Sequence, residues 1–223
     1  MTWTVYPIVA GATRRYKLMR IWQVPYQLQI LESGGGPRSP GMHVSEIIRD
    51  LSVRGGVLDE RYATEPMSPE RIELGIAWEE RLAKHHGDTI NFHPGEMVVD
   101  GVAMSMDGVS YNDETSVFTC DGEGALHEFK LTWKSSRREI DREFMWMTQI
   151  KSYLHGLRVT SGAEYTTAFL HAFFVNGGYG KSGYKDGPDY QIWGLEFTPL
   201  EIHENWTMLI SHLARMKGRH TGL

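Results

Sequence analysis

Apolar and polar residues alternate along residues 125–133, and this alternation predicts a short β-strand. Successive side chains of a strand point to opposite faces, so Glu128 and Lys130 share one face while Phe129 and Leu131 lie on the other. A carboxylate and an ammonium group are thereby aimed at the same place. Such a pair also occurs on solvated strands as an ordinary ion pair, so the pattern alone leaves both interpretations open.

Similar patterns predict strands elsewhere. Residues 96–111 read as two strands broken at the Asp-Gly pairs that they contain, each of which is compatible with simple turn chemistry. Residues 166–175 and 190–197 read as a strand pair around a loop over 176–188 that is rich in Gly, Lys and Tyr. Residues 1–32 predict either one or two strands or a strand with a short helix.

A helix over residues 69–86 is predicted by its end signals. Ser68 is a candidate N-cap, Pro69 takes the favoured first helical position, and Gly87 follows the last turn. At ~100° per residue, one side of this helix is apolar or small and the other is charged. The expected inner side holds Ile72, Gly75, Ile76, Leu82 and Ala83, and the outer side holds Glu70, Glu73, Glu80, Arg81 and Lys84.

Glu79 falls on the expected inner side of this helix. A carboxylate in that position costs free energy unless a basic group or a metal ion compensates it. A buried salt bridge, a wet groove or a metal site would each account for it. Gly75, one turn earlier, would allow another backbone to approach closely.

A second long helix is predicted over residues 137–157, a final one over 199–215, and a short one over 45–51. The apolar stripe of the second helix consists of Ile140, Phe144, Met147, Ile150 and Leu154. Its far side holds Arg138, Arg142, Gln149 and Tyr153. That side is either an ordinary solvated face or a face with a specific polar role.

The composition is typical of a globular protein: of the 223 residues, 41% are hydrophobic and 23% are charged. The single cysteine, Cys120, excludes an internal disulfide and any site made of cysteines alone. Because no apolar run approaches the ~20 residues of a membrane span and no signal pattern opens the chain, we expect a cytoplasmic protein without a membrane partner. The formal net charge of -5 requires any DNA contact to use local basic patches.

Three carboxylates and one lysine follow one another in an order that suits metal-dependent hydrolysis. A helix carries Glu79, a strand end carries Asp107, and the next strand carries Glu128 and Lys130. Carboxylate oxygens suit Mg²⁺ or Mn²⁺, which keep several waters and need few protein ligands. A metal-bound water has a lowered pKa, and a nearby lysine can orient or deprotonate it. These are the groups needed to hydrolyse a phosphodiester.

Four motifs stand in this order: Gly75-x-x-x-Glu79, Asp107-Gly108, Glu128-x-Lys130 and Gln149-x-x-x-Tyr153. Their order resembles the PD-(D/E)XK nuclease superfamily, and within it the branch of lambda exonuclease and the RecB nuclease domain. The resemblance spans roughly residues 43–215. It implies an α/β (α+β) fold with a restriction-endonuclease-like core, in which a central mixed sheet is flanked by helices. Residues 1–42 would be an N-terminal extension and residues 43–223 the nuclease domain.

The resemblance assigns a role to each matching position. Asp107 and Glu128 would be the principal metal ligands, and Lys130 would position or activate the water. Glu79 would be a further ligand, direct or through water, and Gln149 would support the site or the scissile strand. Nucleic-acid contacts are expected from Arg138, Arg142, Tyr153, Lys181 and Lys185, although a packing role is equally compatible with the tyrosine.

The implied activity is that of a Mg²⁺- or Mn²⁺-dependent DNA exonuclease that resects duplex ends for recombination or repair in a phage-like setting. Candidate partners are DNA, further copies of the chain, and a single-strand-annealing or recombination protein. A structure-specific or single-strand-specific endonuclease of the same fold is the nearest alternative. From another class, a non-catalytic nucleic-acid-binding or phage assembly protein on the same fold is the rival.

The chain departs from the family pattern in ways that leave alternatives open. Met106 stands where a proline is usual and the interval to Glu128 is long, so Asp100 or Asp113 could replace Asp107 as the strand-end ligand. The lone cysteine cannot hold the iron-sulfur cluster of some relatives of the RecB branch. The histidines have no zinc-site spacing, but a mixed site of His86 with Glu79 remains open.

Overall fold

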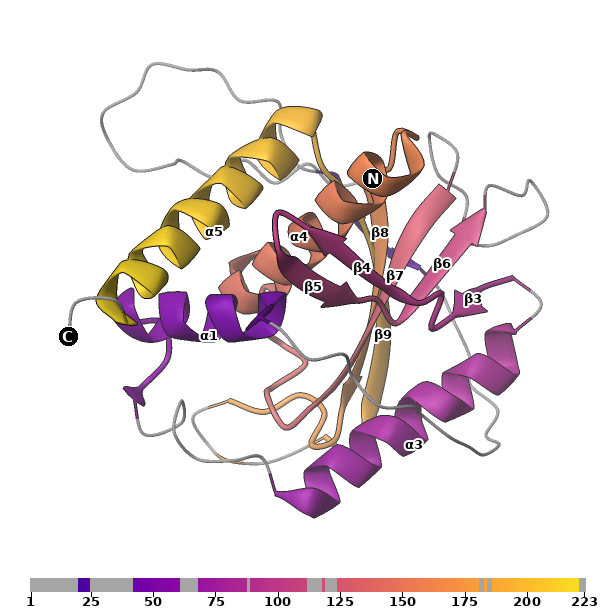
Figure 1. Ribbon diagram of the computed structural model, residues 1–223. Coiled ribbons are helices and arrows are strands. Elements are labelled where there is room, and N and C mark those ends of the chain that lie inside the picture. Colours follow the sequence, from indigo (N-terminus) through magenta and orange to yellow (C-terminus); the bar gives the residue numbers. More distant parts are fainter. Residues whose placement is uncertain are drawn as a thin grey trace.

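The structure is a computed structural model that describes residues 20–24, 42–60, 68–87, 89–111, 118, 124–180, 183 and 186–220. It is a mixed α/β protein in which a six-stranded sheet has helices on both faces (Figure 1). This confirms the predicted α/β (α+β) class and the mixed sheet flanked by helices. No helix within the described segments is long and apolar enough to cross a membrane.

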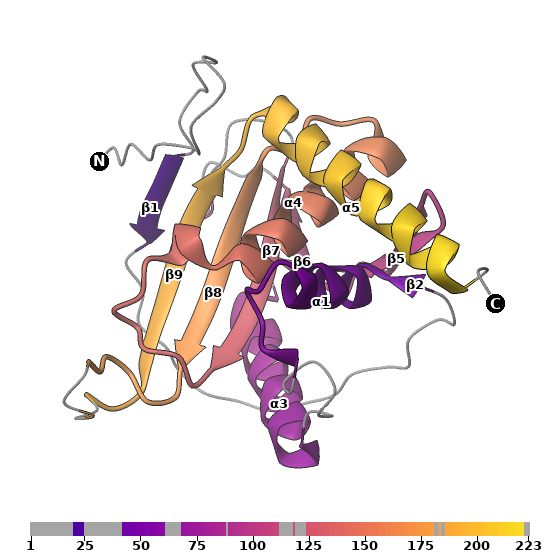
Figure 2. The ribbon, with the colours of Figure 1, turned by 90° about the vertical axis from the view of Figure 1, so that its left-hand side faces the viewer.

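The larger sheet has the strand order β1-β9-β8-β7-β6-β3. Its strands are β1 (Arg20–Val24), β3 (Asn91–Phe92), β6 (Gly108–Tyr111), β7 (Gly124–Thr132), β8 (Thr167–Phe174) and β9 (Asp189–Glu196). All neighbours are antiparallel except β7 and β8, which are parallel because helix α4 (Phe144–Ser161) crosses over between them (Figure 2). The residues predicted as an N-terminal extension contribute β1 to this sheet.

A smaller sheet has the order β2-β5-β4, with strands β2 (Met42–His43), β4 (Glu96–Val99) and β5 (Val102–Ser105). The β4–β5 hairpin turns at Asp100 and Gly101, whose φ angles of 51° and 74° are both positive, as a two-residue hairpin turn requires. Residues 96–111 therefore form three strands and not the predicted two, because the chain leaves this sheet after β5 and enters β6 of the larger sheet.

The helices are α1 (Val44–Arg54), α3 (Pro69–His86), α4, α5 (Pro199–His220) and a 3-10 turn, η1 (Ile140–Arg142). The bounds of α3 match the prediction. The start of α4 does not, because the chain before Phe144 is held in turns: the amide of Arg137 donates to Ser135 Oγ, and that of Arg138 to the carbonyl of Ser135. The predicted helix over residues 137–157 therefore begins seven residues too early.

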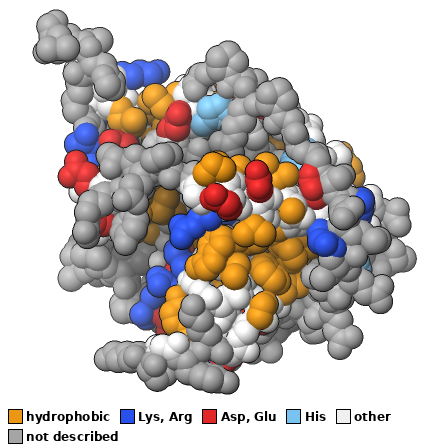
Figure 3. All heavy atoms as spheres, turned by 90° about the horizontal axis from the view of Figure 1, so that it is seen from below, with side chains coloured by type: hydrophobic (Ala, Val, Ile, Leu, Met, Phe, Trp, Pro, Cys, Tyr) orange, Lys and Arg blue, Asp and Glu red, His pale blue; other side chains and the backbone are white. Residues whose placement is uncertain are grey.

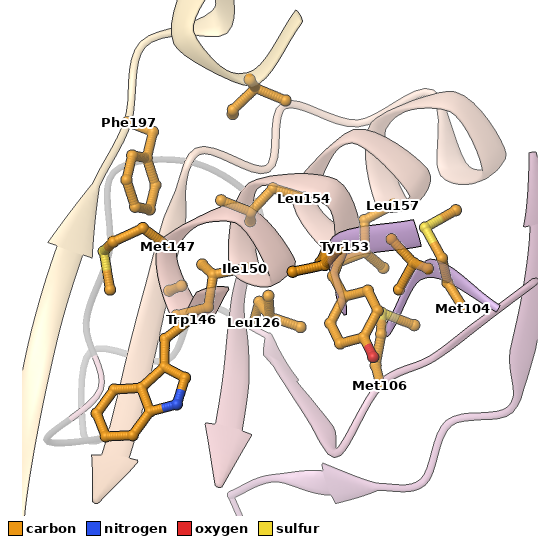
Figure 4. Close-up of a cluster of buried hydrophobic side chains, with 14 of the residues drawn as sticks. Met104, Met106, Leu126, Trp146, Met147, Ile150, Tyr153, Leu154, Leu157 and Phe197 are labelled. Carbon is orange, nitrogen blue, oxygen red and sulfur yellow. The ribbon is translucent and has the colours of Figure 1, made fainter. Parts of the chain in front are cut away.

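One face of the larger sheet is covered by α1, α4 and α5, and the other by α3 (Figure 1). On the first face, Ile150 and Leu154 of α4 pack with Leu126 of β7, and Met104 and Met106 close one end of the cluster (Figure 4). The second face is more aromatic and includes Trp78, Phe118, Phe129 and Phe169. The side chains of β7 therefore alternate between the two clusters.

The inner side predicted for α3 is right for Leu82, which is buried, and wrong for Ile72 and Ile76. Ile72 and Ile76 are 48% and 40% exposed, and the buried residues are Trp78, Leu82 and His86. The helix is rotated because the Trp78 ring packs between Phe173 and Tyr190 of the sheet. A Cβ on Gly75 would meet nothing within 4 Å among the described residues, so no backbone described in the structure approaches it. On the side where α3 lies, exposed apolar side chains gather next to acidic ones (Figure 3).

Candidate functional site

The site is centred on β7, where Glu128 and Lys130 lie on the face covered by α4. Glu128 is completely buried, and the Lys130 side chain is 20% exposed. The Lys130 ammonium donates a hydrogen bond to Glu128 Oε1. Phe129 and Leu131 pack on the opposite face, as the alternation predicts. A solvated surface ion pair is therefore excluded, because the carboxylate has no access to solvent.

Asp107 joins this pair from the neighbouring strand. Gly108 of β6 lies opposite His127 of β7, which brings Asp107 alongside Glu128. Asp107 Oδ2 accepts a hydrogen bond of 2.8 Å from the amide of Phe129. Gly108 is the first residue of strand β6 and not a turn residue. A Cβ on Gly108 would lie 2.7 Å from Ile90 Cγ2 and would clash, so the position requires glycine. The Asp107-Gly108 pair thus has a positional role that the Asp-Gly pair of the hairpin turn lacks.

Of the alternative strand-end ligands, Asp100 is directed elsewhere. Its Oδ2 accepts a hydrogen bond of 2.8 Å from Trp206 Nε1 of α5. Asp113 and Cys120 lie outside the described residues. Asp107 is therefore the aspartate that the described structure brings to Glu128.

The charges of the site perturb one another strongly. Burial, with the nearby charges of Asp107 and Glu79, raises the pKa of Glu128 to about 8 against the opposing effect of Lys130. Burial alone would lower the pKa of the Lys130 ammonium, but Glu128, Asp107 and Glu79 outweigh it and raise that pKa. The lysine therefore stays charged, and the Glu128 carboxyl retains a proton near neutral pH.

Glu79 reaches the site from α3. It is half-buried, and its charge acts on both Glu128 and Lys130. Lys130 is thus one positive charge with which Glu79 interacts. Its neighbour Glu80 is half-buried as well, so burial does not distinguish the two carboxylates. The electrostatic effect of Glu79 on Glu128 and Lys130 is what sets it apart.

Gln149 and Tyr153 extend the site along α4. Lys130 Nζ donates to Gln149 Oε1 at 3.0 Å, and Gln149 Nε2 donates to the Tyr153 hydroxyl at 2.9 Å. Tyr153 is 4% exposed and packs with Met106 and Leu126 (Figure 4). The tyrosine therefore holds the glutamine in place from the core and does not offer a surface to nucleic acid.

The predicted face of Arg138 and Arg142 with Gln149 and Tyr153 is not formed, because both arginines precede α4. The Arg138 guanidinium donates to Glu143, which also accepts from Lys134. Arg142 pairs with Glu139. The side chains of Arg138 and Arg142 are 53% and 67% exposed, so their ion pairs leave them accessible. Lys181 and Lys185 lie outside the described residues.

Sequence reasoning missed a set of buried histidines behind the site. His127 and His171 are fully buried, and His86 packs against His171 and Phe118 on the sheet face opposite Glu128. A mixed site of His86 with Glu79 is therefore not formed by the described residues. The one available signal was that His127 alternates with Glu128 along β7, on the side of the aromatic residues.

Two observations bear on a metal ion. Within the described part of the chain, no three Asp, Glu, His or Cys side chains converge closely enough to form a complete cage. Glu128 Oε2, however, is buried and has no hydrogen-bond partner there. Mg²⁺ is commonly bound through one or two carboxylates with water completing its shell, so Glu128 and Asp107 fit such an ion.

Comparisons with protein-family models, with curated proteins and with solved structures each returned no match to this chain.

Proposed function

We propose that this chain is a metal-dependent nuclease of the PD-(D/E)XK type that hydrolyses phosphodiester bonds of DNA with Mg²⁺ or Mn²⁺. The observation that carries the proposal is Glu128 Oε2, a buried carboxylate oxygen without a hydrogen bond from any described residue. Leaving such a group unsatisfied costs roughly 1–3 kcal/mol and more when it is charged. A bound ion is one explanation for such an unsatisfied group.

A purely structural ion pair accounts poorly for the site. Buried salt bridges stabilise a fold only when their charges are matched and their remaining lone pairs are satisfied. Here the negative charges of Glu79, Asp107 and Glu128 all act on a single ammonium, that of Lys130. A divalent cation would balance this excess of negative charge and displace the retained proton.

Each residue of the site would have a distinct role in hydrolysis. Glu128 and Asp107 would hold the ion, with Glu79 bound directly or through water. The bound ion would supply Lewis acidity at a phosphate oxygen and at a water molecule. Because its pKa is raised, Lys130 would orient the water and stabilise charge on the phosphate rather than remove a proton. Gln149 would fix the lysine through their 3.0 Å hydrogen bond.

Two further features support DNA as the substrate. The mixed sheet flanked by helices agrees with the fold that the motifs imply. Near the site, the segment between β7 and α4 carries the partly exposed cations Lys134, Arg137, Arg138 and Arg142. Such cations can contact phosphates despite the negative net charge of the chain. An exonuclease acting on duplex ends is the preferred form, with a homo-oligomer and a recombination protein as partners.

The test is cleavage of end-labelled linear duplex, closed circular duplex and single-stranded DNA with Mg²⁺, Mn²⁺ or EDTA. The variants are Glu128→Gln and, as a control, Glu80→Gln, which alters a half-buried carboxylate outside the site. We expect metal-dependent loss of linear duplex with wild type and the control but not with Glu128→Gln. Cleavage of circles would indicate an endonuclease. DNA retention in EDTA without cleavage by any form would refute the proposal in favour of a binding protein.

A further inference from the structure

Four polar side chains, three of them buried and one partly buried, form a hydrogen-bonded row across the face of the sheet opposite Glu128. They are Ser110 of β6, His127 of β7, His171 of β8 and Tyr190 of β9. His127 Nε2 lies 2.9 Å from Ser110 Oγ, His127 Nδ1 lies 3.0 Å from His171 Nε2, and His171 Nδ1 lies 2.7 Å from the Tyr190 hydroxyl. We call this row the polar ladder. It contains one residue from each of four successive strands.

The ladder runs diagonally through the strand pairing. Ser110 lies opposite Ala125 and not opposite His127, and His171 lies opposite Phe129. Long side chains bridge such diagonal neighbours. Burial lowers the pKa of His127 to about 3 and that of His171 well below its usual value, so both rings are neutral. Each then has one donor and one acceptor, which suffices for an unbroken row.

Helix α3 docks on the far end of this ladder. The Trp78 ring meets the Tyr190 ring edge-on at 5.0 Å and the Phe173 ring at 4.8 Å. Two turns later, the ring of His86 lies 5.9 Å from that of His171. The ladder residues His171 and Tyr190 therefore contact the helix at two of its three buried positions.

Trp78 is followed directly by Glu79, whose charge reaches Glu128 and Lys130. We propose that the ladder is a positioning device: it holds α3 on the sheet through Tyr190 and Trp78, and thereby sets where Glu79 stands relative to Glu128. The ladder also holds β7 in place through His127, which directly precedes Glu128 in that strand. The ligands on both elements are thus placed from behind the site. The inference rests on the proposed function, because Glu79 is given its role there.

The test uses Tyr190→Phe, which removes the last ladder hydrogen bond and keeps the ring that meets Trp78. Thr167→Val is the control, a buried polar change on β8 outside the ladder. We expect Tyr190→Phe to raise the Mn²⁺ concentration for half-maximal cleavage roughly tenfold, as loss of a group supporting a metal ligand does. In a Glu79→Gln background it should have no further effect, whereas with Gln149→Ala the two effects should multiply.

An unchanged Mn²⁺ dependence in Tyr190→Phe, or an equal effect with and without Glu79, would overturn the positioning role and leave a structural one. Hydrogen exchange tests the coupling even if wild type neither binds Mn²⁺ nor cleaves DNA, which would refute the proposed function alone. Amides of residues 78–86 should exchange faster in Tyr190→Phe than in wild type or Thr167→Val. Equal protection in all three proteins would refute the ladder as the anchor of α3.

Discussion

Replacing Glu128 with Gln should make the metal-free protein more stable while removing its activity. The pKa of this carboxyl is raised from 4.5 to about 8 by burial and by neighbouring carboxylates. A raised folded-state pKa means that the stability of the protonated form is complete below pH ~4.5 and is lost as pH rises through ~8. Glutamine mimics the protonated acid and does not titrate, so the variant avoids this loss.

The size of the effect follows from the shift. Near pH 7 the unfolded chain ionises Glu128 and the folded chain does not, and at 1.36 kcal/mol per pKa unit the difference is roughly 3 kcal/mol. For a protein of this length, ~3 kcal/mol corresponds to an increase in Tm of roughly 6–12 °C. The gain should be small at pH 5 and largest near pH 8, because only the wild-type group titrates between them.

Thermal unfolding followed by circular dichroism in EDTA at pH 5, 6, 7 and 8 measures this difference. Glu143→Gln is the control, since that buried carboxylate is bound by Lys134 and Arg138 and should lose stability when neutralised. Mn²⁺ should raise the Tm of wild type and not that of Glu128→Gln. If Glu128→Gln is no more stable than wild type at any pH, or if its gain in stability does not grow with pH, the raised pKa of Glu128 is refuted.

Three more outcomes are expected. Lys130→Ala should reduce cleavage at least ~100-fold with folding and DNA binding retained in gel-shift assays, and near-normal turnover would remove the lysine from the mechanism. Glu79→Gln should impair Mn²⁺-dependent cleavage more than Glu80→Gln, and equal effects would contradict the assignment of Glu79. His86, His127 and His171 have lowered pKa values in the folded state, so each fully buried histidine should lower stability by ~1.4 kcal/mol per pH unit as pH drops below ~6.5. Urea unfolding of Glu128→Gln measures this without the opposing titration of Glu128, and a flat profile between pH ~6.5 and ~4.5 would disprove the burial of the histidines as neutral rings.

Local patterns in the sequence were sufficient for several parts of this structure. The alternation around Glu128 determined which side chains share a face, because neighbouring side chains in a strand must point in opposite directions. The cap residues of α3 determined both its ends, since a proline at the first turn and a glycine after the last act locally. The strand pair over residues 166–197 and the final helix followed from the same kind of signal.

The tertiary structure decided what depends on contacts between distant residues. The pattern of α3 allowed several rotations, and only the aromatic face of the sheet selects the one that buries Trp78 in place of Ile72 and Ile76. Asp100 and Asp107 are alike in sequence, and the register of β6 with β7 brings only the second to Glu128. The polar ladder joins four strands, and two of its hydrogen-bonded residues, His127 and His171, lie 44 positions apart in the sequence. A local sequence pattern cannot indicate such a contact, because the contact exists only once the strands have paired.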